Sequence, residues 1–115
     1  MIYSRLIAGT MTWGSWGKQL STKEMAVLMN HCISNHITTF DHEDIYGAYT
    51  KEADFGKAFR ESAINREAIQ LISKCGIQYV CDNRNTKVKH YNYSKEYIIW
   101  SVEESLKNLN TEYLD

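Results

Sequence analysis

Proline, surplus charge, long apolar runs and cysteine are all scarce in this sequence. Proline does not occur at all, whereas an ordinary chain contains about 5% of it. The 13 Lys and Arg residues nearly balance the 14 Asp and Glu residues, so the formal net charge is −1. A chain so close to neutral has no overall field that would favour nucleic acid or an anionic membrane surface. We therefore expect no nucleic-acid partner and no membrane partner.

The apolar residues are dispersed along the chain. No run of them approaches the ~20 residues that a membrane-spanning helix needs. Residues 1–10 lack the basic start, apolar core and small-residue cleavage site of a signal peptide. The three cysteines are odd in number and form no Cys-x-x-Cys pair, which indicates reduced thiols and a cytoplasmic location. At 115 residues, the chain is long enough for one small domain and too short for two.

Hydrophobic periodicity predicts alternating strands and helices. Ser21 followed by Glu24 forms a capping box, which marks the start of a helix. Apolar residues then recur every three or four positions, as on one buried helix face. Short β-branched and aromatic runs read as strands. We expect strands at 5–8, 37–40 and 68–73, helices from 21, from about 50 to 62 and from near 94, a polar loop at 74–93, and the start of a fourth strand at 113–115.

The predicted buried faces can be assigned by residue. On the first helix they are Met25, Leu28, Met29, Cys32 and Ile33; on the second, Phe55, Ala58 and Phe59; on the third, Ile98, Val102, Ser105 and Leu109, widened by Ile99 and Leu106.

Strands that alternate with amphipathic helices predict a parallel sheet, because a parallel neighbour requires a crossover connection. Either an open doubly wound sheet or an eightfold barrel would satisfy this pattern. The turn after the first strand, residues 9–14, lacks the GxGxxG pattern of a dinucleotide-binding Rossmann unit. In a barrel, the chemistry sits on the loops that follow the strands. Those loops would be 9–20, 41–49 and 74–93, with helices on one face of a curved sheet.

Three residues after the second and third strands suggest a catalytic group. Asp41 and Tyr46 follow one strand, and Lys74 follows the next, so the three could meet at the same edge of the sheet. A lysine cation near a tyrosine stabilises the phenolate and makes the phenol a better acid, and a carboxylate would hold the lysine in place. Such a group can protonate a carbonyl oxygen. Taken singly, Asp41 is more often a turn former and Tyr46 a packed loop aromatic, but a lysine ending an apolar strand is expensive unless paired.

Other polar clusters point less clearly to function. His42, Glu43 and Asp44 beside Asp41 could suggest a metal site, but alternate side chains on an extended segment point to opposite faces and cannot converge. Cys75, Cys81 and His90 do not have a usual zinc spacing. We therefore expect no metal. The basic and aromatic residues between 87 and 93 are better explained by a solvated loop over a barrel mouth than by a nucleic-acid patch.

Five segments, in this order and at this spacing, resemble the landmarks of the aldo-keto reductase superfamily, and most closely its bacterial oxidoreductases. They are AGTMTWG (8–14), TTFDHEDIYG (38–47), EADFGKAF (52–59), LISKCGI (71–77) and SVEESLKNLNTEYLD (101–115). The resemblance covers essentially the whole chain. It implies an α/β fold that is the N-terminal part, about three βα units, of a (β/α)8 TIM barrel, with residues 1–115 as an incomplete domain ending at the start of the fourth strand.

The resemblance also implies an activity and a set of site residues. The activity is NAD(P)H-dependent reduction of aldehydes or ketones, an oxidoreductase reaction on a small-molecule carbonyl substrate, with NADP(H) favoured over NAD(H) and no metal. The implied catalytic residues are Asp41, Tyr46 and Lys74; the implied cofactor-binding residues are Gly9, Thr10, Met11 and Asp41; Trp13 is implied as a substrate-pocket residue.

The family's catalytic histidine and most of its cofactor site would fall beyond residue 115. We therefore expect the chain by itself not to reduce carbonyls at a useful rate. The alternative is a catalytically inactive barrel fragment that acts only as a folding or interaction module. Open barrel edges would give such a fragment a tendency to associate with itself.

Overall fold

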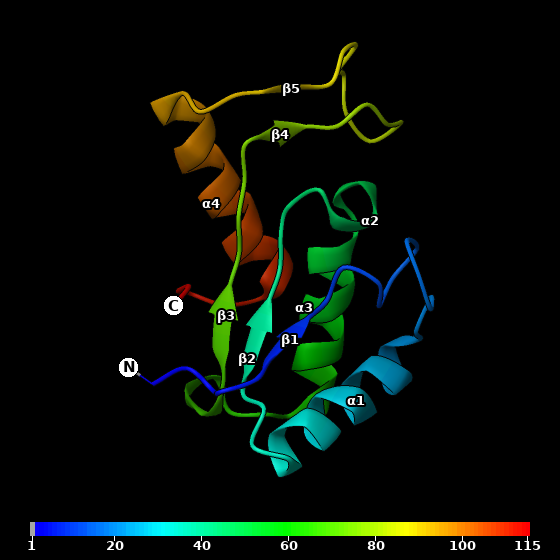
Figure 1. Cartoon of the computed structure of the whole chain (residues 1–115), viewed down its shortest axis with the longest axis vertical. Coiled ribbons are helices and arrows are strands. Elements are labelled where there is room, and N and C mark those ends of the chain that lie inside the picture. Colours follow the sequence, from blue (N-terminus) through cyan, green and yellow to red (C-terminus); the bar gives the residue numbers. More distant parts are fainter. Residues whose placement is uncertain (1) are drawn as a thin grey trace.

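The computed structural model describes residues 2–115, which form a three-stranded parallel sheet with helices packed on one side (Figure 1). The strands β1 (Ile7–Gly9), β2 (Thr39–Asp41) and β3 (Gln70–Ile72) pair in sequential order, with Ala8, Phe40 and Leu71 in register. The sequential parallel order was predicted from the alternation of strands and helices. Each strand is one to three residues shorter than predicted.

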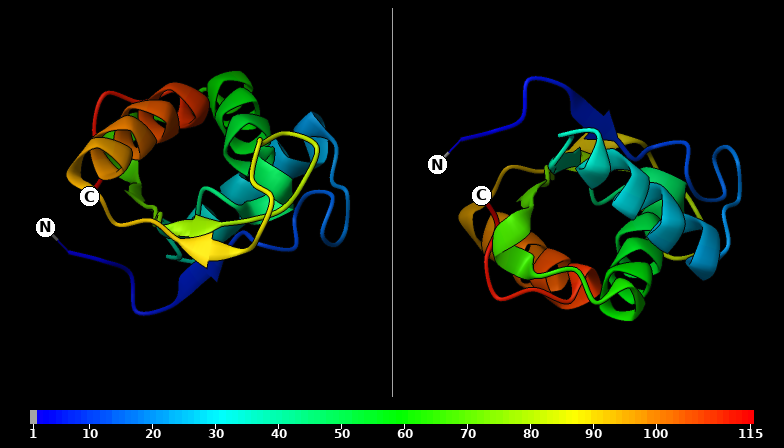
Figure 2. Two further views of the ribbon diagram at one scale, coloured as in Figure 1. Left: turned by 90° about the horizontal axis from the view of Figure 1, so that it is seen from above. Right: turned by 90° about the horizontal axis from the view of Figure 1, so that it is seen from below.

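Helices connect the strands and cover one face of the sheet. They are α1 (Thr22–Ser34), α3 (Lys51–Ser62) and α4 (Lys95–Leu109), and they lie on the same side of the sheet when it is viewed along the strands (Figure 2). The short elements are α2 (Tyr46–Tyr49), a 3-10 turn η1 (Arg66–Ala68), and the antiparallel strands β4 (Ile77–Gln78) and β5 (His90–Tyr91). None of the helices described here is both long and apolar enough to cross a membrane.

The hydrophobic core lies between the sheet and this helix layer. Phe40 and Leu71 point into it from the sheet, while Met25 and Met29 enter from α1 and Phe55 from α3. The capping box of α1 forms as predicted: Ser21 Oγ accepts from the Glu24 N–H, and Glu24 accepts from the Ser21 N–H. The predicted buried faces of the first two long helices are confirmed, since their members are buried or packed against the core.

The predicted buried face of α4 is wrong for its first half. Ile98 and Val102 are 39% and 41% exposed, whereas Ser101, Ser105 and Leu109 are buried. Ser105, which was predicted to be buried, donates a hydrogen bond to the buried Glu52 carboxylate of α3. The C-terminal end of α4 packs closely on α3, since a Cβ at Gly56 would meet the backbone of Asn108 and Leu109.

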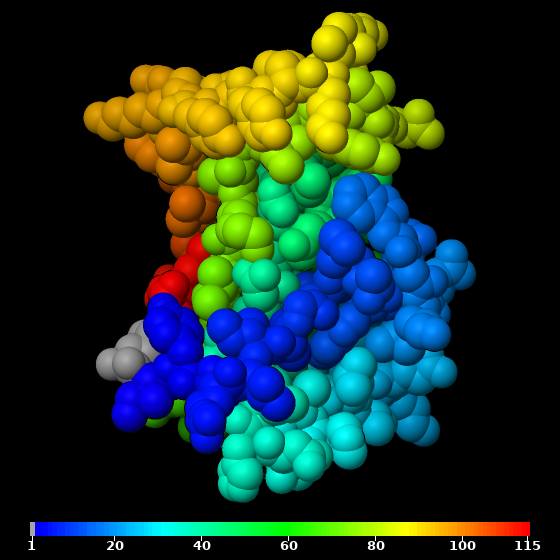
Figure 3. All heavy atoms as spheres, viewed as in Figure 1, coloured from blue at the N-terminus to red at the C-terminus, as the bar shows by residue number. Residues whose placement is uncertain are grey.

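The segment at 74–93 was predicted to be a loop, and the structure shows that it contains the β4–β5 hairpin. This hairpin lies at the carboxyl end of the three parallel strands (Figure 1) and forms the upper part of the molecule in the space-filling view (Figure 3). Residues 113–115 form no strand. They nevertheless run beside β3, because the Asp115 N–H donates to the Leu71 carbonyl at 2.9 Å.

Candidate active site

The carboxyl ends of β2 and β3 bring Lys74 and Asp41 together. Lys74 Nζ lies 2.6 Å from Asp41 Oδ1 and 2.7 Å from the carbonyl oxygen of His42. The backbone around the pair continues the sheet, because the His42 N–H donates to Ile72 O and the Asp44 N–H donates to Lys74 O. The pair is therefore anchored by the same parallel hydrogen bonding that forms the sheet.

Tyr46 joins this pair from the first residue of α2. Lys74 Nζ lies 5.6 Å from the centroid of the Tyr46 ring, close enough for a cation–π contact. The structure thus brings together the three residues that the sequence singles out. All three retain solvent-accessible surface, and the side chains of Lys74 and Asp41 are 43% and 35% exposed. A phenol ring, an ammonium group and a carboxylate therefore lie together at one accessible edge of the sheet.

Beneath this surface lies a buried histidine. His42 has no exposed surface, its Nδ1 lies 2.8 Å from Thr10 Oγ1, and its ring packs 4.3 Å from the Phe55 ring. Burial, assisted by the nearby Lys51 and Lys74 cations, holds the pKa of His42 well below its ordinary value. The imidazole is therefore neutral and acts as packing beneath the Asp41–Lys74 pair.

Two buried carboxylates lie behind the same edge. Glu52 on α3 accepts from Ser73 Oγ at 2.5 Å and from Ser105 Oγ at 3.0 Å, which ties the residue before Lys74 to both helices. Asp44 is buried and neither of its carboxylate oxygens has a hydrogen-bond partner. Burial, and then repulsion from Glu52, raises the pKa of Asp44 to about 7. Among residues 2–115, no group of three His, Cys, Asp or Glu side chains is arranged to hold a metal.

Trp13 packs in the core of this structure, and its expected place in a substrate pocket stays a prediction. It is only 8% exposed and packs edge-on to Phe40 at 6.1 Å and against Phe55 at 6.2 Å. The aromatic residue beside the trio is instead Trp16, whose ring lies 6.4 Å from Tyr46 and 5.3 Å from Tyr79. The sequence does signal this residue, since Trp16 occupies the same glycine-containing loop, but position alone could not decide which tryptophan turns inward.

The expected cofactor-binding residues of the loop after β1 differ in their exposure to solvent. Gly9 is exposed at the end of β1 with no atom within 4 Å of where a Cβ would be, and Met11 is 46% exposed. Thr10 is fully buried, and its hydroxyl lies 3.0 Å from Asp41 O as well as 2.8 Å from His42 Nδ1. Thr10 therefore has no accessible surface in this structure, and its expected role in cofactor binding stays a prediction.

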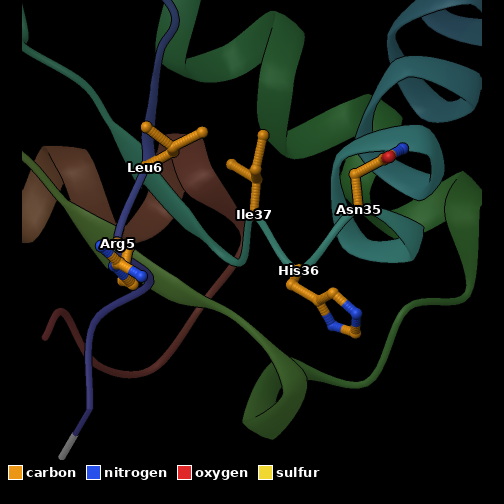
Figure 4. Close-up of a pocket in the computed structure, with 5 residues that line it drawn as sticks. All are labelled: Arg5, Leu6, Asn35, His36 and Ile37. Atoms are coloured by element: carbon orange, nitrogen blue, oxygen red, sulfur yellow. The ribbon is translucent and has the colours of Figure 1, made fainter.

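A hollow at the opposite end of the strands does not form a second site. Its lining residues come from the approach to β1 and from the turn between α1 and β2, and their side chains do not converge (Figure 4). Conserved chemistry in parallel barrels belongs to the carboxyl end, and the amino end serves stability. The lining residues are Arg5, Leu6, Asn35, His36 and Ile37.

The parallel strands, the one-sided helix layer and the polar cluster at the strand ends define part of a (β/α)8 barrel. The sequence profile of the Aldo/keto reductase family matches residues 5–115, and the chain belongs to this family. Solved structures agree. An aldo-keto reductase of Pseudomonas aeruginosa superposes with a TM-score of 0.80 at 26% identity, covering 98% of this chain and 40% of that one. The holo form of aldo-keto reductase AKR11C1 from Bacillus halodurans gives 0.76 at 26% identity, covering 98% and 34%.

Curated relatives are oxidoreductases of greater length. The oxidoreductase YcsN of Bacillus subtilis is 46% identical over 114 residues, which are 98% of this chain and 37% of YcsN. Oxidoreductase YdhF of Escherichia coli is 35% identical over 98% of this chain and 37% of its own length. The 6-dehydroglucose reductase of Agrobacterium fabrum is 33% identical, over 97% and 38%. The chain therefore spans somewhat more than a third of the relatives that it matches.

Proposed function

We propose that this chain is the N-terminal part of a nicotinamide-dependent reductase of aldehyde or ketone carbonyls, with Asp41, Tyr46 and Lys74 as its catalytic residues. The supporting observation is the placement of Lys74 Nζ, 2.6 Å from the Asp41 carboxylate and 5.6 Å from the Tyr46 ring centroid. This cluster lies at the carboxyl end of the strands, where barrel enzymes carry their active sites.

The three side chains divide the work of protonating a carbonyl oxygen. The Tyr46 phenol donates its proton to that oxygen as general acid. The Lys74 ammonium group compensates the negative charge that remains on the phenolate oxygen, and Asp41 holds the ammonium group in place. A reduced nicotinamide, when bound, supplies the hydride that reaches the carbonyl carbon.

Three of the expected cofactor residues fit a nicotinamide at this edge. Gly9 and Asp41 pair across the ends of β1 and β2 and keep accessible surface, as does Met11 two residues beyond Gly9, and the empty space at Gly9 would admit a flat ring against the backbone. We extend the proposal to NADP(H) rather than NAD(H), on the family resemblance. A cytoplasmic location is consistent with the three cysteines, all of which are free thiols.

The proposed function can be tested in a chimera in which the rest of the barrel comes from YcsN. In a chimera, residues 1–115 replace the matched part of YcsN, and NADPH consumption is followed with aromatic aldehydes and a keto-sugar. Tyr46→Phe should lower kcat by roughly 100-fold to 10,000-fold while cofactor affinity changes little. Tyr91→Phe, on the exposed surface of β5, is the matched control and should retain turnover. Near-full turnover by Tyr46→Phe would rule out this residue as the proton donor.

A second candidate is an inactive module that folds or associates. Exposed apolar side chains favour it, since Ile7 on the sheet and Ile99 on α4 are 51% and 49% exposed, and apolar surface of this kind promotes association. Sedimentation of the 115-residue chain should then show self-association, and the chain alone should not oxidise NADPH. Saturable, Tyr46-dependent turnover by the chain alone would contradict this candidate.

A further inference from the structure

We infer that residues 77–84, the first arm and turn of the hairpin, position Tyr46 by holding the left-handed turn that follows it. This inference rests on the proposed role of Tyr46 as the acid. It assigns a positioning function to Tyr49 and Asn83, which lie outside the catalytic trio.

The turn after Tyr46 has an unfavourable backbone conformation. Gly47, Ala48 and Tyr49 have φ values of 63°, 54° and 67°, three consecutive residues in the left-handed region. A Cβ crowds the following carbonyl in this conformation, so alanine and tyrosine adopt it only when their surroundings impose it. A side chain at Gly47 would also be crowded, because a Cβ there would lie 2.7 Å from Thr50 Oγ1.

Polar contacts from the hairpin impose that conformation. The Tyr49 hydroxyl donates to the Ile77 carbonyl at 3.1 Å and accepts from the Tyr79 N–H at 3.0 Å. Asn83 Nδ2 donates to the Ala48 carbonyl at 2.6 Å. Ala48 and Tyr49, the two left-handed residues that carry a Cβ, are thus both hydrogen-bonded to residues 77–84. Burial raises the pKa of the Tyr49 phenol, which keeps the hydroxyl protonated and able to donate.

Aromatic packing fixes the segment on its other side. The Arg84 guanidinium lies 3.8 Å from the centroid of the Tyr49 ring and 4.8 Å from that of Trp100 on α4. Tyr79 reaches the Trp16 ring, which in turn contacts the Tyr46 ring. The hairpin is therefore attached to α4 and to the loop after β1 while it holds the turn. Release of the turn would change where Tyr46 sits relative to Lys74.

The first experiment measures the turn directly in the 115-residue chain by hydrogen exchange. Tyr49→Phe keeps the ring beside Arg84 and removes both hydroxyl bonds. Amides of residues 45–50 should exchange faster, while those of α1 stay protected and show that the fold is intact. Asn83→Ala should produce the same local effect, and Tyr91→Phe should not. Unchanged exchange at 45–50 in both Tyr49→Phe and Asn83→Ala would overturn the inference.

The second experiment asks whether the effect passes through Tyr46. In the YcsN chimera, Tyr49→Phe should lower kcat by about 10-fold to 100-fold, the scale expected for a misplaced catalytic group, with a smaller change in KM. In a Tyr46→Phe background the same substitution should cost nothing further. An equal loss in both backgrounds would overturn the inference. An inactive parent chimera would instead refute the proposed function, and hydrogen exchange would still decide the role of the hairpin.

Discussion

Two lysines on either side of His42 show how differently this fold treats a positive charge. Lys74, at the strand ends, is 43% exposed and pairs with Asp41 and a backbone carbonyl. Lys51, in the core beneath, has no exposed surface, and its Nζ lies 3.8 Å from Met25 Sδ and 5.2 Å from the Phe55 ring centroid. Both cations lower the pKa of His42. The comparison separates a solvent-accessible, paired cation, which we propose takes part in catalysis, from a cation buried in the core.

The core charge is expensive. Burial lowers the pKa of Lys51 from the ordinary 10.5 to about 8, although nearby Asp54 and Glu52 oppose the change. Cation–π contacts with Trp13 and Phe55 offset part of the hydration free energy that the Lys51 ammonium group loses on burial. At the strand ends the arrangement is reversed, because solvent and a carboxylate both remain available to Lys74. Function should therefore depend on Lys74, and stability on Lys51.

The largest difference that we expect between substitutions of the two lysines is in turnover. In the chimera, Lys74→Met should lower kcat by about 100-fold or more, since the phenolate left by Tyr46 would lose its compensating charge. Lys51→Met, the matched substitution in the core, should leave kcat within about two-fold, because no part of Lys51 reaches the surface at the strand ends. Similar losses in the two variants would show that the comparison is mistaken.

The next largest expected effect is that of Lys51→Met on the stability of the chain and on its pH dependence. Lys51→Met should stabilise the chain at pH 7 by roughly 3 kcal/mol, which corresponds to the pKa difference between the unfolded and folded states. Between pH 8 and 10.5 the unfolded chain binds more protons at Lys51 than the folded chain does. Wild-type stability should therefore rise with pH relative to Lys51→Met. Urea unfolding of both chains across this range measures the difference, and a difference independent of pH would contradict it.

The smallest effect concerns the stability of the exposed pair. Asp41→Asn should change the free energy of unfolding by less than about 1 kcal/mol, because a partly solvated ion pair contributes little. The same variant should reduce turnover in the chimera by freeing the Lys74 side chain. A large loss of stability measured by urea unfolding would mean that the pair supports the fold as well as the reaction.

The order of the three parallel strands and three long helices, and the sheet edge where the trio lies, could be predicted from local sequence patterns. The signals for these elements lie between residues close together in the sequence. They are the helical periodicity, the β-branched runs, the Ser21 capping box and the polar residues at the strand ends. The meeting of Asp41 and Lys74 follows from parallel, in-register strands, and the resemblance added the barrel. The roles of these residues in catalysis stay predictions.

Other features of the molecule could not be predicted from local patterns. Trp13 enters the core and Trp16 lies by Tyr46, although both occupy one loop. The Thr10 hydroxyl is hydrogen-bonded to Asp41 and His42, which lie 31 and 32 positions away in the sequence. In the first half of α4, Ser101 faces inward while Ile98 and Val102 remain partly exposed, which the apolar pattern of this helix does not predict. Each outcome depends on contacts between distant segments, and such contacts exist only once the chain has folded.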